Sequence, residues 1–112
     1  MKENLLQIIN HYGVLPQLKQ FNEEAYELIE AIRNYEYQYD ACEVIGCKEY
    51  HIEKEKEYIA EEIADCYVML NQFQLYYGIE NKQIEETMKF KIDRQLERIE
   101  NEKDNKSNRF VE

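Results

Sequence analysis

Hydrophobic residues recur every three or four positions along most of this chain, which is the spacing of one face of an α-helix. The pattern predicts four helices, over about residues 2–10, 16–33, 52–77 and 81–101. Gly13 and Gly78 follow the first and third of these segments, where glycine often ends a helix. Long amphipathic segments with short connections favour an all-α fold, namely an antiparallel bundle of about four helices.

The segment between the second and third predicted helices has the weakest periodicity. Residues 34–52 read NYEYQYDACEVIGCKEYHI, and we interpret them as an extension of the second helix followed by a connection. A turn there would let the third helix fold back antiparallel. Residues 104–112 are polar, and we expect them to form a flexible tail. The sequence therefore predicts one domain over residues 1–103, with an insert around residues 34–52.

The chain is strongly acidic, with 24 Asp and Glu against 14 Lys and Arg and a formal net charge of −10. Such a surface repels a phosphate backbone, which disfavours a nucleic-acid-binding role. It does not exclude a small phosphorylated ligand, because a bound divalent cation can reverse the local charge. No run of about 18 apolar residues occurs, so we expect no contact with a membrane.

The cysteine count indicates a reducing compartment. Cys42, Cys47 and Cys66 form an odd set without a disulfide framework, which favours a cytoplasmic protein. The start of the chain is polar within a few residues and does not read as a signal peptide. A helical domain of 112 residues buries a modest core and often completes it by oligomerising.

Four acidic residues differ from the rest in their helical neighbours. Many acids have a basic residue three or four positions away, as Glu30 has Arg33, and such pairs are typical of a solvated helix surface. An E-x-x-E pair and an E-x-x-D pair on consecutive predicted helices have no such neighbour. Their members are Glu24, Glu27, Glu62 and Asp65.

This spacing predicts a metal site. Residues three apart lie about 60° apart around a helix, so both carboxylates of each pair share a face, and Glu62 should be partly sheltered beside Ile59. Sheltered, unpaired carboxylates repel one another, and a divalent cation would remove that repulsion. All-oxygen ligands suit Mg²⁺ first and Mn²⁺ second. The alternative is that all four acids point into water.

Other metal chemistries fit the sequence less well. A carboxylate-bridged di-iron bundle needs Glu-x-x-His motifs, and neither His11 nor His51 follows a Glu by three positions. Cys42 and Cys47 have no partners at zinc-finger spacing. Cys66 lies on the apolar stripe of its helix, where we expect it to act as a small core residue.

The last predicted helix carries a local basic stripe. Lys91, Arg94 and Arg98 lie within about 60° of one face, which makes them candidates for binding phosphate. The alternative is surface pairing with Asp93 or Glu97.

Together these residues resemble the MazG-like, all-α nucleoside triphosphate pyrophosphatases. The resemblance covers roughly residues 17–98 apart from the middle segment. It rests on QLKQFNEEAYELIEAI, EEIADCYVMLNQFQLYYGI and the basic KFKIDRQLER. The family hallmark, E-x-x-E on one helix and E-x-x-D on the next, corresponds to the four acids above. The interval between Glu27 and Glu62 is longer than in compact members because of the insert.

The resemblance implies hydrolysis of a (deoxy)nucleoside triphosphate to the monophosphate and pyrophosphate. It implies Mg²⁺ held by Glu24, Glu27, Glu62 and Asp65, with Glu27 also acting on the attacking water. Lys91 and Arg94 would hold phosphate oxygens. Family members form dimers or dimers of dimers, so a homodimer or homotetramer is expected. The alternative is a non-enzymatic helical module whose tyrosines and apolar stripes form a protein interface.

Overall fold

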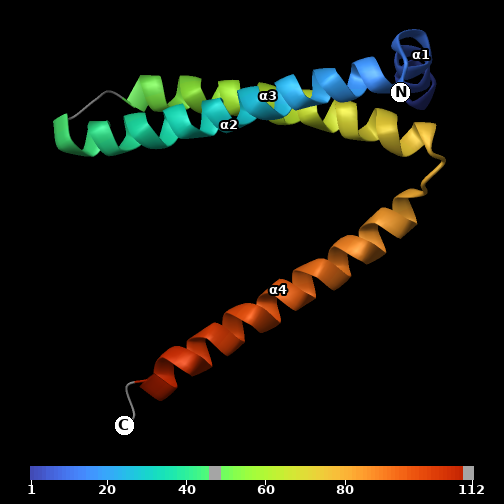
Figure 1. The fold of residues 1–112 in the computed structure, drawn as a ribbon. Helices are drawn as coiled ribbons and strands as arrows, with labels where there is room; N and C mark the ends of the chain where they lie inside the picture. The colour runs from blue at the N-terminus through green and yellow to red at the C-terminus, as the bar shows by residue number, and fades with distance from the viewer. Residues whose placement is uncertain (46–48, 110–112) are drawn as a thin grey trace. The chain divides into compact units, whose positions relative to one another are not determined.

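The computed structural model describes the backbone of residues 1–45 and 49–109, and the side chains of residues 1–38 and 53–105. All regular secondary structure in these ranges is helical, and the prediction of an all-α chain with four helices is confirmed (Figure 1). The helices are α1 (Lys2–Tyr12), α2 (Val14–Ile45), α3 (Glu49–Tyr76) and α4 (Asn81–Arg109).

Two of the helices are longer than the periodicity predicted. α2 continues to Ile45, the residue before Gly46, so the first part of the irregular segment is a helical extension. α4 continues to Arg109, well beyond the predicted end near residue 101. Neither stretch contains Gly or Pro, the residues that most strongly interrupt a helix, and helical backbone therefore persists after the hydrophobic pattern fades.

Residues Met1–Gly78 form one compact unit, built around a pair of antiparallel helices. α2 and α3 lie side by side along this unit, and α1 packs against both of them (Figure 1). Gly13 makes the junction between α1 and α2: its φ of 91° suits glycine, and its amide donates to the Ile9 carbonyl at 2.8 Å. The glycine thereby ends α1 and lets α2 begin at the next residue.

The core of this unit is small and partly polar. Its buried apolar residues include Ile9 from α1, Ala31 from α2, and Cys66 and Met69 from α3. The expectation that Cys66 is a small core residue is thus confirmed. The rings of Phe21 and Phe73 meet edge to face between α2 and α3, with their centroids 5.9 Å apart.

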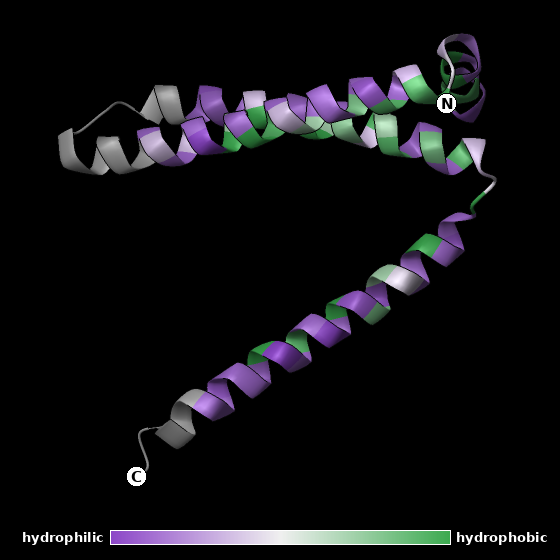
Figure 2. Ribbon diagram, viewed as in Figure 1, coloured by the Kyte–Doolittle hydropathy of each residue, from purple (hydrophilic) through white to green (hydrophobic). Residues whose placement is uncertain are grey.

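The face that α3 turns towards the core coincides only in part with the predicted apolar stripe, to which Cys66 belongs. Glu62, Met69 and Gln72 are buried, whereas large apolar side chains one position further along remain exposed on the same helix. These exposed residues are Ile63 and Leu70. Hydrophobic and polar residues are interleaved around each helix (Figure 2), so the periodicity of α3 alone does not specify which side faces α2.

The second unit, Ile79–Glu112, contains α4. Apolar residues recur every three or four positions along α4, and all of them are exposed. They are Ile84, Met88, Ile92, Leu96 and Ile99. No helix in the described parts of the chain has both the length and the apolar character needed to cross a membrane.

Candidate metal centre

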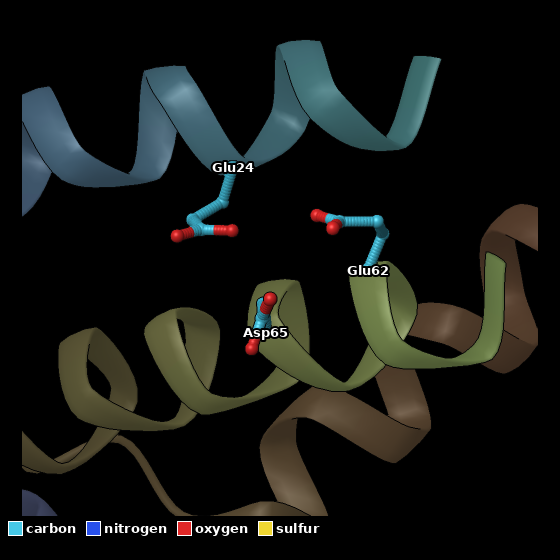
Figure 3. A group of neighbouring side chains, drawn as sticks. All are labelled: Glu24, Glu62 and Asp65. Carbon is cyan, nitrogen blue, oxygen red and sulfur yellow. The ribbon is translucent and has the colours of Figure 1, made fainter. Parts of the chain in front are cut away.

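Three of the four predicted carboxylates come together between α2 and α3. Glu24 projects from α2 towards α3, and Glu62 and Asp65 project from successive turns of α3 (Figure 3). One oxygen from each of the three side chains lies within 4.8 Å of the others. Because α2 and α3 run antiparallel, the two short motifs meet across the helix pair. This is the only such group of three potential ligands among the residues that the structure describes.

The group is unusual because it is partly buried. The Glu62 side chain is 6% exposed, Glu24 is half-buried, and Asp65 remains exposed. Glu24 Oε2 and Glu62 Oε2 are both shielded from solvent, and neither has a hydrogen-bond partner among the described residues. A buried oxygen without a partner loses its hydration without compensation, which costs about 1–3 kcal/mol and more when the group is charged. A cation bound among these oxygens would offset both the lost hydration and the mutual repulsion of the carboxylates.

The other oxygen of Glu24 is already engaged. Gln20, one helical turn earlier on α2, donates from Nε2 to Glu24 Oε1 at 2.9 Å. This leaves Oε2 as the oxygen of Glu24 that lacks a partner.

Electrostatics in the group raise the pKa of two of its carboxylates. Burial, followed by repulsion from Glu27, Asp65 and Glu24, raises the pKa of Glu62. The hydrogen bond from Gln20 lowers the pKa of Glu24, but burial and repulsion from Asp65 and Glu27 outweigh it, so this pKa is also raised. Both groups therefore gain when a proton, or a cation in its place, neutralises their charge.

Glu27, the fourth predicted ligand, lies outside the three-residue group. Its side chain is exposed on α2. It is still close enough for its charge to raise the pKa of Glu62 and of Glu24. Glu27 therefore borders the group while remaining accessible to water.

Two further side chains sense the same negative charge. The pKa of Tyr58 on α3 is raised chiefly by the Glu62 carboxylate. Burial, and then repulsion from the three acids, raises the pKa of the Cys66 thiol. Sequence reasoning gave no role to Tyr58 or to Gln20. Gln20 precedes Glu24 by four residues, and Tyr58 precedes Glu62 by four. Residues at this spacing are neighbours on a helix, so the sequence contained a signal for both contacts.

The donor set fits a hard divalent cation. All three groups offer carboxylate oxygens, the ligands that Mg²⁺ and Mn²⁺ prefer, and no nitrogen or sulfur atom belongs to the group. Among the acids with a basic neighbour, Glu30 pairs with Arg33 at 3.4 Å and Glu53 with Lys56 at 3.6 Å. Glu24, Glu62 and Asp65 are thus separated from the solvated pairs by their geometry as well as by their sequence context.

The predicted phosphate-binding residues lie on α4. Lys91 and Arg94 are exposed, and the Arg94 guanidinium lies 5.8 Å from the centre of the Phe90 ring. They belong to the second unit, and their role in binding phosphate stays a prediction. The side chains of Cys42, Cys47 and His51 lie outside the described residues.

Comparisons with protein-family models, with curated proteins and with solved structures find no match for this chain.

Proposed function

We propose that this chain is a MazG-like nucleoside triphosphate pyrophosphohydrolase, which converts a (deoxy)nucleoside triphosphate to the monophosphate and pyrophosphate. The observation that carries the proposal is the pair of buried, unpartnered oxygens of Glu24 and Glu62, which lie beside Asp65 in one group. A partly buried carboxylate cluster without a counter-charge is unfavourable in a folded protein, and divalent-cation binding would relieve it.

In this proposal Glu24, Glu62 and Asp65 hold Mg²⁺. When bound, the cation would supply positive charge to the phosphate oxygens as negative charge builds up during phosphoryl transfer. The net charge of −10 would otherwise oppose the approach of a triphosphate. For Lys91 and Arg94, which belong to the other unit, we propose a separate role in binding phosphate oxygens.

Glu27 is the residue that we assign to the attacking water. It borders the group, carries a carboxylate that is not among the three closest ligands, and is exposed. It accepts a proton from water as the oxygen attacks the α-phosphorus. The bond from the α-phosphorus to the bridging oxygen breaks, and pyrophosphate leaves with that oxygen.

The direct test is a panel of nucleoside triphosphates incubated with the full chain and Mg²⁺, scored separately for pyrophosphate and orthophosphate. We expect pyrophosphate and the monophosphate in equal amounts. Orthophosphate as the only inorganic product would show attack at the terminal phosphorus and would refute the proposal.

A matched pair of variants assigns the activity to the site. Glu62→Gln removes one buried ligand, whereas Glu61→Gln makes the same chemical change at an exposed position next to it. We expect Glu62→Gln to lower turnover at least about 100-fold and Glu61→Gln to leave it within about 2-fold. Equal activity in the two variants would show that the hydrolysis arises elsewhere, including from a contaminant.

The exposed apolar surface supports the further proposal of a homodimer or homotetramer. Leu15 is 76% exposed, and Tyr26 and Tyr67 are each 62% exposed. Side chains of this size are normally covered, and a second copy of the chain would complete the small core into a larger helical bundle.

The same surface also favours a second candidate function, a helical protein-interaction module without catalytic activity. That module predicts that neither Mg²⁺ nor Glu62→Gln alters any metal-dependent property of the protein. Thermal melting with and without Mg²⁺ or Mn²⁺ separates the two, because a ligand that binds only the native state raises its melting temperature.

A further inference from the structure

We infer that Gln20 is a positioning residue, which orients Glu24 so that Oε2 is the oxygen presented to the cation. This inference rests on the proposed metal site and adds a residue that lies outside the E-x-x-E and E-x-x-D motifs. Gln20 Nε2 donates to Glu24 Oε1 at 2.9 Å, while Glu24 Oε2 is buried and has no hydrogen-bond partner among the described residues.

The two oxygens of Glu24 are therefore not equivalent. A free glutamate side chain rotates about its last bond and offers either oxygen, or both, to a cation. With Oε1 held by the Gln20 amide, rotation of the carboxylate is restricted and the buried Oε2 is the oxygen left for a cation. Hydrogen bonds of this kind to a ligating carboxylate fix its orientation, and their loss commonly lowers metal affinity by about 10-fold or more.

The place of Gln20 in the fold argues against a mainly structural role. Its side chain is exposed, and its bond to Glu24 is a local contact within one helix. By contrast, Gln17 donates to Gln72 at 2.7 Å across the buried boundary between α2 and α3, where an amide pair ties the two helices together. Loss of the Gln20 bond should thus change the site without changing the packing of the helices.

Gln20 is uncharged, and this affects how the site attracts a cation. An amide restrains Glu24 and leaves the negative charge of the group available to attract a cation. A lysine at the same position would also reach Glu24, but its ammonium charge would compensate the carboxylate permanently and compete with the metal. The two kinds of substitution therefore have different expected effects on the metal-free protein.

The test measures Mn²⁺ affinity of the full chain by titration, with free Mn²⁺ followed by its electron paramagnetic resonance signal. Gln20→Met keeps the length of the side chain and removes the donor, and Gln20→Lys replaces the donor with a cation. The control is Asn22→Met, which also exchanges an amide for a thioether on α2, at an exposed position on a different side of the helix. Melting temperatures without metal are recorded for every variant.

We expect Gln20→Met to weaken Mn²⁺ binding about 10-fold with the metal-free melting temperature lowered by no more than about 4 °C, and Asn22→Met to match the unmodified protein. Gln20→Lys should bind Mn²⁺ more weakly still, while its metal-free melting temperature is unchanged or raised. If Gln20→Met binds within about 2-fold of Asn22→Met, or loses affinity only together with stability, the inference is overturned and the metal site stands. If the unmodified protein binds no Mn²⁺, the proposed function fails and the inference fails with it.

Discussion

Replacing the Glu62 carboxylate with an amide should stabilise the metal-free protein and abolish its stabilisation by metal. Glu62 is 6% exposed, has one oxygen without a partner among the described residues, and faces Glu24 and Asp65. Glu62→Gln removes a buried charge of the same sign as its neighbours, and the new amide can donate hydrogen bonds to their carboxylates. The substitution should therefore increase the free energy of unfolding of the metal-free protein, although it removes the proposed activity.

The distances allow the size of this effect to be bounded. Two unit charges 4.8 Å apart repel by about 3.5 kcal/mol at an effective dielectric constant of about 20. Partial protonation and the water around the exposed Asp65 reduce this repulsion, so we expect a net gain in the free energy of unfolding of about 1–2 kcal/mol. For a unit of this size each kcal/mol shifts the melting temperature by about 4–8 °C.

Thermal melting or urea denaturation at neutral pH, with a chelator and then with excess Mg²⁺, provides the measurement. A cation at about 100 times its dissociation constant stabilises a native protein by about 2.7 kcal/mol. Glu62→Gln should therefore melt above the unmodified protein in chelator and below it in Mg²⁺. Glu61→Gln, which is exposed, should stay within about 0.5 kcal/mol of the unmodified protein in both conditions.

The reversal of order between the two conditions is the decisive result. If Glu62→Gln is less stable than Glu61→Gln in chelator, the buried carboxylate is satisfied in the folded protein and the argument from repulsion is wrong. If the two variants respond equally to Mg²⁺, Glu62 is not a ligand.

Two further predictions concern pH and the buried amide pair. The raised pKa values of Glu62 and Glu24 mean that the native state binds more protons than the unfolded chain between the ordinary glutamate pKa and the raised values. The free energy of unfolding without metal should therefore increase as pH falls from 7 through that window. Urea denaturation at several pH values measures this, and in Glu62→Gln the free energy of unfolding should depend less steeply on pH. If the free energy of unfolding depends equally on pH in both proteins, Glu62 does not have the raised pKa that this prediction requires. Separately, Gln17→Leu or Gln72→Leu alone should lower the free energy of unfolding by about 1–3 kcal/mol, because each leaves the other buried amide without its hydrogen-bond partner. The double variant should recover much of this stability. A double-mutant cycle with urea denaturation measures this coupling, and additive losses would show that the 2.7 Å bond adds nothing to stability.

The helices could be predicted from local properties of the chain. Gly13 and Gly78 mark the ends of α1 and α3 because both adopt positive φ, a backbone conformation that other residues avoid. The extension of the second helix beyond residue 33 was expected, and it reaches Ile45, whereas the length of α4, which continues to Arg109, was underestimated. Helical backbone needs only the absence of interrupting residues, whereas hydrophobic periodicity reports burial, and the two therefore end at different places.

The candidate site was only partly predictable. The absence of basic neighbours distinguished Glu24, Glu27, Glu62 and Asp65 from the other acids, and the sheltered position of Glu62 is confirmed. That Glu27 borders the group, and that the Gln20 amide engages Glu24, depends on side-chain directions and on the register between two helices.

By itself the sequence determined an all-helical chain, the ends of its first and third helices, and a set of acids on two helix faces. Only the tertiary structure decided that Met69 and Gln72 face the core while Ile63 and Leu70 do not. Spacing along a helix specifies angles around one axis, but apolar residues surround α3 too widely to choose a side. That choice is made by how α3 packs against α1 and α2, and the same packing brings the carboxylates of Glu24, Glu62 and Asp65 into one group.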